Sequence, residues 1–264
     1  MSEGKIILPK ERREAKETVP RSLLIYSLPK AGKTTIVSQL EDSLILECEP
    51  GGADFVSGRV LDIESPGQLA SAISEIENAG RPYKYIIVDT MTRLDEWSEI
   101  VGTYNYMEKP QGKRLNREGD MPGGKLISHT DKRFVTVHEL PNGNGYQYSR
   151  TQMLYWYNRL SMLAPHVIFL AHVRDKYLES SSTGEVVESI EISLTGKVKS
   201  IIASRVDAIG YLYRKGNQGI LNFKNENNVT CGGRCSHLNN EIVISEKQDD
   251  GSIATYWEKI YNNV

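Results

Sequence analysis

A loop that contains glycine and lysine, placed between a predicted strand and a predicted helix, constrains the fold of this chain most strongly. The apolar run Ser22–Tyr26 is typical of a buried parallel strand, and the residue spacing over Thr34–Leu40 predicts a helix. The connecting residues Ser27–Thr35 read Ser-Leu-Pro-Lys-Ala-Gly-Lys-Thr-Thr. They match the phosphate-binding pattern G-x-x-x-x-G-K-[ST], except that serine replaces the first glycine. A strand, this loop and a helix in that order indicate the start of an α/β domain.

The chemistry of phosphate binding gives several loop positions a role. Backbone N–H groups of the loop and of the helix N-terminus would face the phosphates. Gly32 lets the backbone approach closely, Lys33 places a charge near the β- and γ-phosphates, and Thr34 supplies a hydroxyl to Mg²⁺. The alternative is a fortuitous Gly-Lys-Thr sequence in an ordinary loop. We expect ATP and Mg²⁺ as ligands, with these nucleotide-binding residues: Ser27, Leu28, Pro29, Lys30, Ala31, Gly32, Lys33, Thr34 and Thr35.

A second predicted strand ends in a carboxylate. Mostly β-branched apolar residues over Tyr85–Val88 lead to Asp89, about fifty residues after the loop. A carboxylate at the carboxyl end of a central strand can hold the coordination shell of Mg²⁺. The alternative is an ordinary strand followed by a capping aspartate. Because both motifs occur in this order, we expect a nucleotide site with Thr34 and Asp89 as metal ligands.

The rest of the chain alternates strands with helices. Strands are predicted at Ser43–Glu47 and Val167–Ala171, and helices at Pro66–Ala79, Leu94–Val101 and Ser149–Leu163. Strands alternating with helices indicate βαβ units and a parallel sheet. We therefore expect an α/β fold with a mostly parallel central sheet flanked by helices.

The domain layout follows from where this periodicity begins, breaks and ends. Residues 1–20 form a polar N-terminal arm, 21–215 the core, and 216–264 a C-terminal tail of strands and loops. Within the core, residues 103–148 are rich in Gly, Asn, Lys and Arg and lack periodicity, which predicts a mobile loop insertion.

Composition excludes several classes of protein. The 32 basic and 34 acidic residues give a net charge of -2, which argues against binding nucleic acid through bulk positive charge. Three cysteines are too few and too irregularly spaced for a disulfide framework. No apolar run approaches the roughly 20 residues of a membrane helix. A cytoplasmic protein with no membrane partner is the expectation.

Two further predicted strands end in sequences that resemble those of a known protein family. The segment Leu44–Gly52 ends in Glu-Pro-Gly-Gly, and the segment Val167–His172 ends in Ala-His. They resemble the second and fourth strands of RecA-like ATPases. The similarity is greatest to the phage-encoded Sak-type single-strand annealing recombinases, and it extends over Arg21–Tyr213. It implies a RecA-like P-loop NTPase core that hydrolyses ATP.

The resemblance implies catalytic roles for Lys33, Glu49 and His172. Glu49 would be the general base that orients the attacking water, and His172 would sense the γ-phosphate. Glu47 competes with Glu49 because residues two apart share a strand face, but Glu49 is closer to the strand end. A solvated or capping Glu49 and a histidine bonded to backbone are the alternatives. Thr90 and Thr92 extend the metal or nucleotide shell.

Neighbouring subunits of RecA-like assemblies can donate a cation to the ATP site. The resemblance therefore implies a homo-oligomer, either a ring or a filament. The candidate trans contacts are basic residues late in the core, although a solvated helix start is the alternative: Lys197, Lys199 and Arg205.

The resemblance also implies that single-stranded DNA binds loops after the third and fourth strands, here 103–148 and 174–193. The first segment interleaves basic and aromatic residues, which neutralise phosphates and stack on bases; the second is acidic overall. A solvated loop diluted by acidic residues is the alternative. The candidate DNA contacts are Lys109, Lys113, Arg114, Arg117, Lys125, Lys132 and Arg133.

One cluster of soft ligands stands outside this scheme. Cys231, Cys235 and His237 lie within seven residues, but a structural zinc site has four ligands and no fourth is nearby. A glycine-rich turn is therefore favoured over a zinc site.

The expected function is Mg²⁺-dependent ATP hydrolysis coupled to single-stranded DNA in phage recombination or annealing. A single-strand-binding protein is a further expected partner, and the host cytoplasm is the expected location. The alternatives are a nucleotide-dependent assembly or loading factor without a direct DNA role, and a small-molecule kinase.

Overall fold

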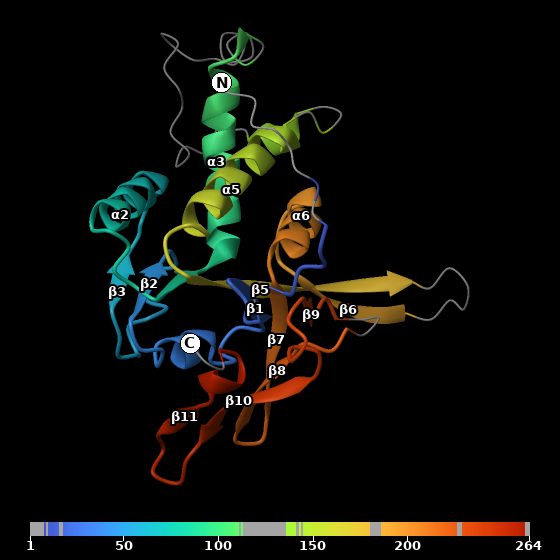
Figure 1. Ribbon diagram of the computed structural model, residues 1–264. Helices are drawn as coiled ribbons and strands as arrows, with labels where there is room; N and C mark the ends of the chain where they lie inside the picture. The colour runs from blue at the N-terminus through green and yellow to red at the C-terminus, as the bar shows by residue number, and fades with distance from the viewer. Residues whose placement is uncertain are drawn as a thin grey trace.

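A computed structural model gives the fold of residues 8, 10–15, 18–110, 112, 136–140, 143, 145–179, 186–225 and 229–261, without the side chains of 175–179 and 186–188. Within these residues the strands form one sheet with the order β11-β10-β8-β7-β1-β5-β4-β2-β3, and β6 and β9 pair with β5 and β7 (Figure 1). The strands are β1 (Ser22–Ser27), β2 (Ser43–Glu47), β3 (Val60–Asp62), β4 (Tyr85–Asp89), β5 (His166–Glu179), β6 (Val186–Ile192), β7 (Ala208–Lys215), β8 (Gln218–Asn222), β9 (Gly232–Gly233), β10 (Glu241–Lys247) and β11 (Ile253–Thr255).

The centre of the sheet is parallel and its C-terminal side is antiparallel. Strands β3, β2, β4, β5, β1 and β7 pair in parallel, whereas β8, β10 and β11 continue the sheet antiparallel. The α/β fold with a mostly parallel central sheet flanked by helices is thus confirmed. The helical elements are α1 (Lys33–Val37), α2 (Pro66–Asn78), α3 (Met91–Met107), α5 (Tyr146–Leu160) and α6 (Lys197–Arg205), with short 3₁₀ turns η2 (Val137–Glu139) and η4 (Trp257–Lys259).

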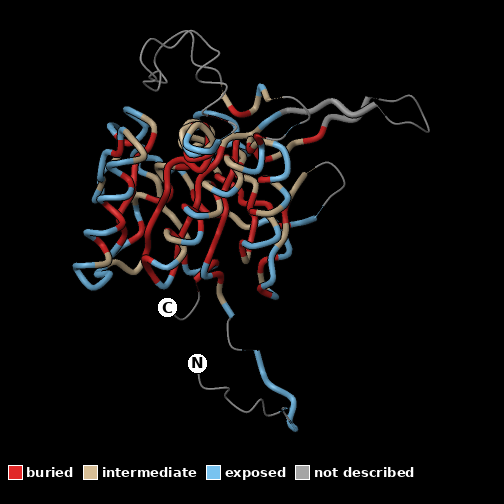
Figure 2. The backbone as a smooth tube through the Cα atoms, turned by 90° about the horizontal axis from the view of Figure 1, so that it is seen from above, coloured by how far each residue is buried: buried red, intermediate tan, exposed pale blue. Residues whose placement is uncertain are grey.

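The two faces of the sheet carry different helices. Alternate residues of a strand point to opposite faces. Leu24 and Tyr26 of β1 pack in a cluster with α2, α3, α5 and α6, whereas Leu23 and Ile25 pack in a cluster with α1 and η4. In Figure 2 the central strands are buried between exposed outer turns. The helix that follows the phosphate loop therefore shares its face of the sheet with the end of the chain.

Most predicted elements occur with shifted ends. The helix expected over Leu94–Val101 is α3, which begins earlier because the Thr90 side chain accepts a hydrogen bond from the N–H of Arg93 and caps the helix. Helix α1 ends at Val37 rather than Leu40. Strand β5 continues beyond the central sheet and pairs antiparallel with β6. Strands β3, β9 and β11 were not predicted, because three residues or fewer carry no periodicity.

The irregular segment 103–148 is helical at its two ends. Residues up to Met107 belong to α3, and those from Tyr146 belong to α5. This corrects the expectation of a loop at those ends, and 113–135 lie outside the described residues. The division of the chain at residue 215 stays a prediction: the β7–β8 pair spans it, and the strands beyond it extend the same sheet.

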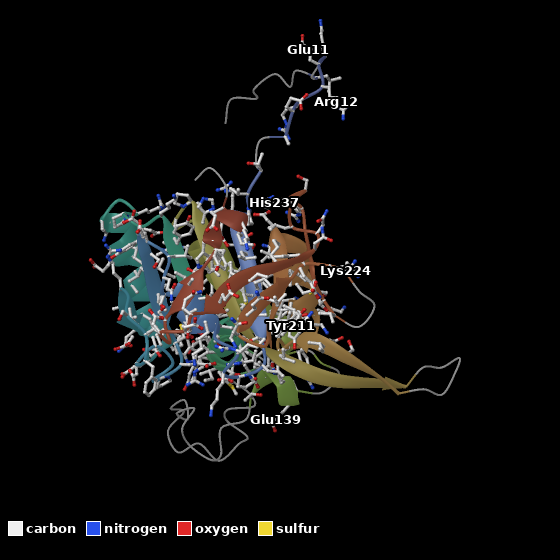
Figure 3. The ribbon with its side chains drawn as sticks, turned by 90° about the horizontal axis from the view of Figure 1, so that it is seen from below. Glu11, Arg12, Glu139, Tyr211, Lys224 and His237 are labelled. Carbon is white, nitrogen blue, oxygen red and sulfur yellow. The ribbon has the colours of Figure 1, made fainter. Side chains whose placement is uncertain are left out.

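The N-terminal arm is exposed over residues 10–15. Figure 3 shows Glu11 and Arg12 of this arm well apart from the sheet. Among the described helices, none has the length and apolar character needed to span a bilayer.

Candidate nucleotide-binding site

Strand register gathers the predicted site residues at one edge of the sheet. Ser27 at the end of β1 lies opposite His172 of β5, and Glu47 at the end of β2 lies opposite Asp89 of β4. The carboxyl ends of parallel strands share an edge, and open α/β sheets bind ligands there. The phosphate loop leaves β1 at this same edge.

The phosphate loop has the backbone that its sequence requires. Gly32 is the N-cap of α1 and has φ of 102°, a conformation that L side chains rarely adopt. Ser27, where the motif has glycine, is fully buried at the end of a regular strand. Its Oγ accepts a hydrogen bond from Lys33 Nζ at 2.9 Å and donates to the carbonyl of Leu28 at 2.8 Å. The serine is therefore accommodated, and it holds the lysine.

Lys33 is buried, with only 7% of its surface exposed. Burial lowers the pKa of its ammonium group, while the carboxylates of Asp89 and Glu49 act in the opposite direction. A buried ammonium beside oxygen acceptors is suited to the anionic phosphates of a nucleotide.

Thr34 and Asp89, the two residues expected to bind Mg²⁺, are in direct contact. Thr34 Oγ1 donates a hydrogen bond to Asp89 Oδ2 at 2.6 Å. Burial raises the pKa of Asp89, and the Thr34 hydrogen bond partly opposes this rise. The peptide bond between Asp89 and Thr90 is cis. Hydroxyl and carboxylate oxygens are the donor types that Mg²⁺ prefers, so these two residues fit the ion.

Glu49 is held by two donors that face the same site. The Nε2 of His172 donates to its Oε1 and Oε2 at 2.9 and 3.1 Å, and Thr90 Oγ1 donates to Oε1 at 2.8 Å. The hydrogen bond from His172 lowers the pKa of Glu49 below its usual range, against the effect of burial. The backbone N–H of His172 donates to Thr92 Oγ1 at 3.0 Å. Glu49 is therefore ionised, as a general base must be.

Glu47 faces a different environment. The N–H of Ala53 donates to Glu47 Oε1 at 2.6 Å, and burial raises the pKa of Glu47. Its side chain holds the turn after β2, whereas Glu49 faces His172. The two glutamates do not share a face, because β2 ends at Glu47 and strand alternation ends with it. The geometry favours Glu49 as the base, although its role stays a prediction.

The three candidate trans cations are not gathered at this site within the chain. Lys199 forms a salt bridge with Glu191, and Arg205 Nη1 donates to Asn158 Oδ1 at 2.9 Å. Lys197 is exposed at the start of α6. Of the candidate DNA contacts, Lys109 is exposed just after α3. The remaining ones lie outside the described residues: Lys113, Arg114, Arg117, Lys125, Lys132 and Arg133.

The cysteine cluster is divided by the sheet. Cys231 belongs to the apolar cluster on one face and Cys235 to the cluster on the other. His237 Nε2 lies 3.0 Å from the carbonyl oxygen of Ile260. In the part of the chain that the structure describes, no group of three His, Cys, Asp or Glu side chains is arranged to hold a metal.

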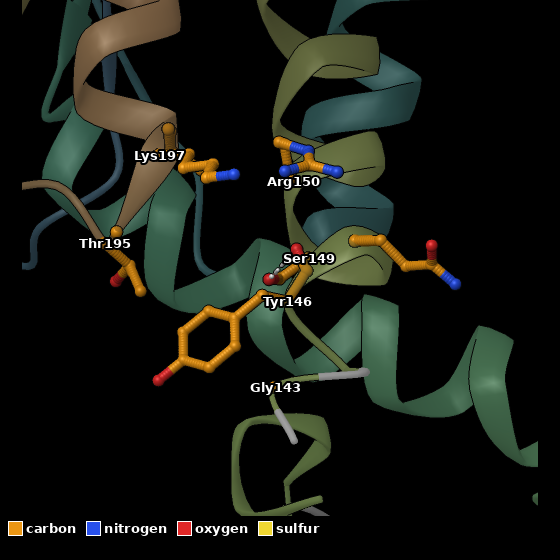
Figure 4. Close-up of a pocket in the computed structure, with 9 residues that line it drawn as sticks. Gly143, Tyr146, Ser149, Arg150, Thr195 and Lys197 are labelled. Carbon is orange, nitrogen blue, oxygen red and sulfur yellow. Dashed lines mark hydrogen bonds between the residues drawn. The ribbon is translucent and has the colours of Figure 1, made fainter. Parts of the chain in front are cut away.

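A cavity of about 450 Å³ lies where α5 and α6 begin (Figure 4). Arg150 of α5 and Lys197 of α6 extend toward each other across it, and the ring of Tyr146 lies at its rim. His138 stacks on Tyr146 with ring centroids 4.3 Å apart, and its Nε2 lies 2.8 Å from Ser149 Oγ. Sequence reasoning missed Arg150, which belongs to no motif, whereas Tyr146 is one of the aromatic residues of the segment 103–148 that was expected to bind DNA.

Hydrogen bonds join this cavity to the nucleotide site. The N–H of Ser193 donates to the carbonyl of His172 at 2.9 Å, and the N–H of Thr195 donates to Asp95 Oδ2 at 2.6 Å. Asp95 lies on α3, the helix whose N-cap, Thr90, donates to Glu49. The segment that lines the cavity is therefore held by β5, the strand that carries His172, and by α3, the helix that begins at Thr90.

Sequence reasoning also missed two contacts from the C-terminal part of the chain. Arg214 Nε donates to the carbonyl of Ala31 in the phosphate loop at 3.1 Å, and Trp257 Nε1 donates to the carbonyl of Ile36 in α1 at 2.8 Å. No local pattern marks either residue, since each contact joins segments more than 180 residues apart.

Comparison with known proteins agrees with the motif. The sequence model of a family described as "AAA domain" matches residues 19–235, a range that includes the phosphate loop, Asp89 and His172. No curated protein sequence matches the chain. The chain is also similar to many solved structures, of which two are described. One is the RadB recombinase, at 11% identity and a TM-score of 0.44, with 90% of this chain and 92% of RadB covered. The other is an ATPase from the type III secretion system of pathogenic bacteria, at 13% identity and a TM-score of 0.39, with coverages of 74% and 53%.

Replacing Glu49 with Gln removes the ionised carboxylate and preserves the side-chain shape. We expect ATP binding to persist while hydrolysis falls by about 100-fold or more, the range for loss of a general base. Steady-state phosphate release and binding of a fluorescent ATP analogue measure the two effects. Glu47→Gln is the matched control. A loss of turnover in Glu47→Gln alone would assign the base to Glu47.

Replacing Ser27 with Ala leaves the buried ammonium of Lys33 without its hydroxyl partner. We expect the free energy of unfolding to fall by about 1–3 kcal/mol in the absence of nucleotide. Saturating Mg²⁺-ATP should reduce this difference, because phosphate oxygens then accept from Lys33. Urea unfolding with and without nucleotide measures both values. Ser38→Ala, just after α1, is the control, and unchanged stability of nucleotide-free Ser27→Ala would contradict the assignment.

Proposed function

We propose that this chain, a nucleotide-binding ATPase that belongs to the AAA domain family, is Mg²⁺-dependent and acts on single-stranded DNA during recombination or annealing. The main support for ATP hydrolysis is that Lys33, Thr34, Asp89 and Glu49 lie together at one edge of the sheet. The main support for DNA binding is the cavity between α5 and α6, which we call cationic because Arg150 and Lys197 line it.

Hydrolysis would use the site residues in the following way. Lys33 binds the β- and γ-phosphates, and Thr34 and Asp89 hold Mg²⁺, which when bound neutralises charge on the phosphates. Glu49 accepts a hydrogen bond from the attacking water and takes its proton as the water oxygen bonds to the γ-phosphorus, while the bond from that phosphorus to the β–γ bridging oxygen breaks and ADP leaves. His172 and Thr90 orient Glu49 through the hydrogen bonds that they donate to it.

The cavity has the properties of a site for a nucleic-acid phosphate and its base. Two helices, of 15 and 9 residues, begin at it, and helix N-termini attract anions. Arg150 and Lys197 add positive charge. The Tyr146 side chain is accessible, with 42% of the residue exposed, and an aromatic face can stack on a base of any sequence. The cavity also lies at the C-terminal ends of the two segments expected to bind DNA, 103–148 and 174–193.

A link between ATP and DNA follows from the hydrogen bonds at His172 and Asp95. A change at the γ-phosphate that moves His172 or Thr90 would also move the segment 193–197 along the cavity. An oligomer, as a ring or filament, would add many weak DNA contacts into a useful affinity. The trans cations, a single-strand-binding partner, a phage origin and a cytoplasmic location remain parts of this proposal that rest on the sequence resemblance.

Binding to a fluorescent oligothymidine, followed by anisotropy over a series of salt concentrations, tests the DNA role. We expect binding in the presence of Mg²⁺-ATP that weakens as salt rises, and ATP hydrolysis that increases when the oligonucleotide is added. Arg150→Glu should weaken binding by at least about tenfold, because it reverses a charge in the cavity.

Arg59→Glu is the control for that experiment, since it makes the same change on an exposed residue beside β3. Thermal unfolding shows whether both variants fold. If the wild-type chain fails to bind at low salt with ATP present, the DNA role is wrong, and a nucleotide-dependent assembly or loading factor becomes the better assignment.

A further inference from the structure

Helix α1 carries the two residues that complete the phosphate loop, yet it is only five residues long. A helix of this length is unstable alone, because the cost of nucleation exceeds what so few hydrogen bonds return. Its N-cap, Gly32, provides no side-chain hydrogen bond. Besides the bonds from Lys33 to Ser27 and from Thr34 to Asp89, the position of this helix therefore depends on what packs against it.

The end of the chain supplies much of that packing. Trp257 Nε1 donates to the carbonyl of Ile36, which lies in the last turn of α1, where carbonyls lack helical partners. The contact is buried, and Trp257 packs in the same apolar cluster as Ile36 and Val37. In Figure 1 the red segment that follows β11 lies beside α1, the blue helix next to the letter C.

A second group of contacts follows directly after α1. Gln39 Nε2 donates to the carbonyl of Ile253 at 2.8 Å, and Thr255 Oγ1 donates to Gln39 Oε1 at 3.1 Å. Residues 253–261, which we call the C-terminal clamp, thus bind both the last turn of α1 and the residues that follow it. The family match ends before the clamp, at residue 235.

Arg214 secures the other end of the loop. It lies near the end of β7, the neighbour of β1 on the side opposite β5. Its Nε donates to the carbonyl of Ala31 at 3.1 Å, and its Nη2 would lie 2.9 Å from a Cβ added to Gly32. The lack of a side chain at Gly32 therefore leaves room for the guanidinium group as well as permitting the backbone conformation.

We propose that Arg214 and the C-terminal clamp are positioning elements of the nucleotide site, so that docking of residues 253–261 and binding of ATP favour each other. The inference rests on the assignment of the loop to nucleotide binding. Three of the contacts are hydrogen bonds to main-chain carbonyls. Arg214 and Trp257 donate to the carbonyls of Ala31 and Ile36, and Gln39, just after α1, donates to the carbonyl of Ile253 in the clamp. They therefore fix the backbone whose N–H groups face the phosphates. By linkage, whatever stabilises the docked clamp must strengthen ATP binding, and ATP must strengthen docking to the same degree.

Trp257→Phe tests the clamp, because it keeps an aromatic ring in the cluster and removes the indole N–H that donates a hydrogen bond to the carbonyl of Ile36. We expect the KM for ATP to rise about five- to tenfold, the effect of one lost hydrogen bond, with a smaller change in kcat. Trp156→Phe is the matched control. Trp156 is also buried, but it lies on α5, and its indole N–H has no hydrogen-bond partner among the residues that the structure describes. We expect its KM to match the wild type.

Arg214→Ala is the second variant, and it changes only an exposed side chain. As for Trp257→Phe, we expect the KM for ATP to rise and kcat to change less. Hydrogen exchange gives a readout that a purely structural role would not move: Mg²⁺-ATP should slow exchange over residues 253–261 in the wild type and not in Lys33→Ala.

The outcomes separate this proposal from the function on which it rests. If Trp257→Phe and Arg214→Ala both retain the KM of Trp156→Phe, and ATP leaves exchange over 253–261 unchanged, the clamp proposal is wrong while the nucleotide site stands. If the wild-type chain neither binds nor hydrolyses ATP, the nucleotide site itself is wrong.

Discussion

The buried ammonium group of Lys33 is the point around which the site is organised. Taking a charge out of water is costly, so a buried ammonium needs partners that offset the lost hydration. In this chain Ser27 accepts its hydrogen bond, and the carboxylates of Asp89 and Glu49 lie close enough to favour its charged form. All of these groups lie at the carboxyl ends of parallel strands, where the order β4-β5-β1 brings distant residues together.

From this centre, contacts extend to two other parts of the molecule. Helix α3 begins after its N-cap, Thr90, which donates a hydrogen bond to Glu49. Asp95 of the same helix accepts a hydrogen bond from the N–H of Thr195, beside the cationic cavity. On the opposite face of the sheet, the C-terminal clamp holds the short helix that carries Lys33. A nucleotide that replaces Ser27 as the partner of Lys33 would therefore affect both the cavity and the clamp. The same arrangement explains why a five-residue helix can carry a phosphate site.

Local patterns in the sequence predicted much of this. The phosphate loop, the strand that ends at Asp89 and the βαβ alternation are short-range signals, and each occurs where it was expected. The choice between Glu47 and Glu49 stayed open because it depends on their hydrogen-bond partners: Ala53 binds Glu47, whereas His172, a residue distant in sequence, binds Glu49. Once the strand stops at Glu47, the rule that residues two apart share a face no longer applies.

The remaining features depend on contacts between distant segments. Arg214 and Trp257 matter because the C-terminal strands extend the same sheet past β7 and return the chain to α1. Arg150 and Lys197 form one cavity because α5 and α6 begin at the same place. Single-sequence patterns carry no information on such pairings, so these residues were either overlooked or, like Lys197, assigned another role.

The most direct test of the account is the rate of ATP hydrolysis by Lys33→Ala, measured as phosphate release with saturating Mg²⁺ beside the wild-type chain. We expect phosphate release by the variant to fall to the background rate of a reaction without protein, because the charge that binds the β- and γ-phosphates is gone. Hydrolysis by Lys33→Ala at the wild-type rate would contradict the account.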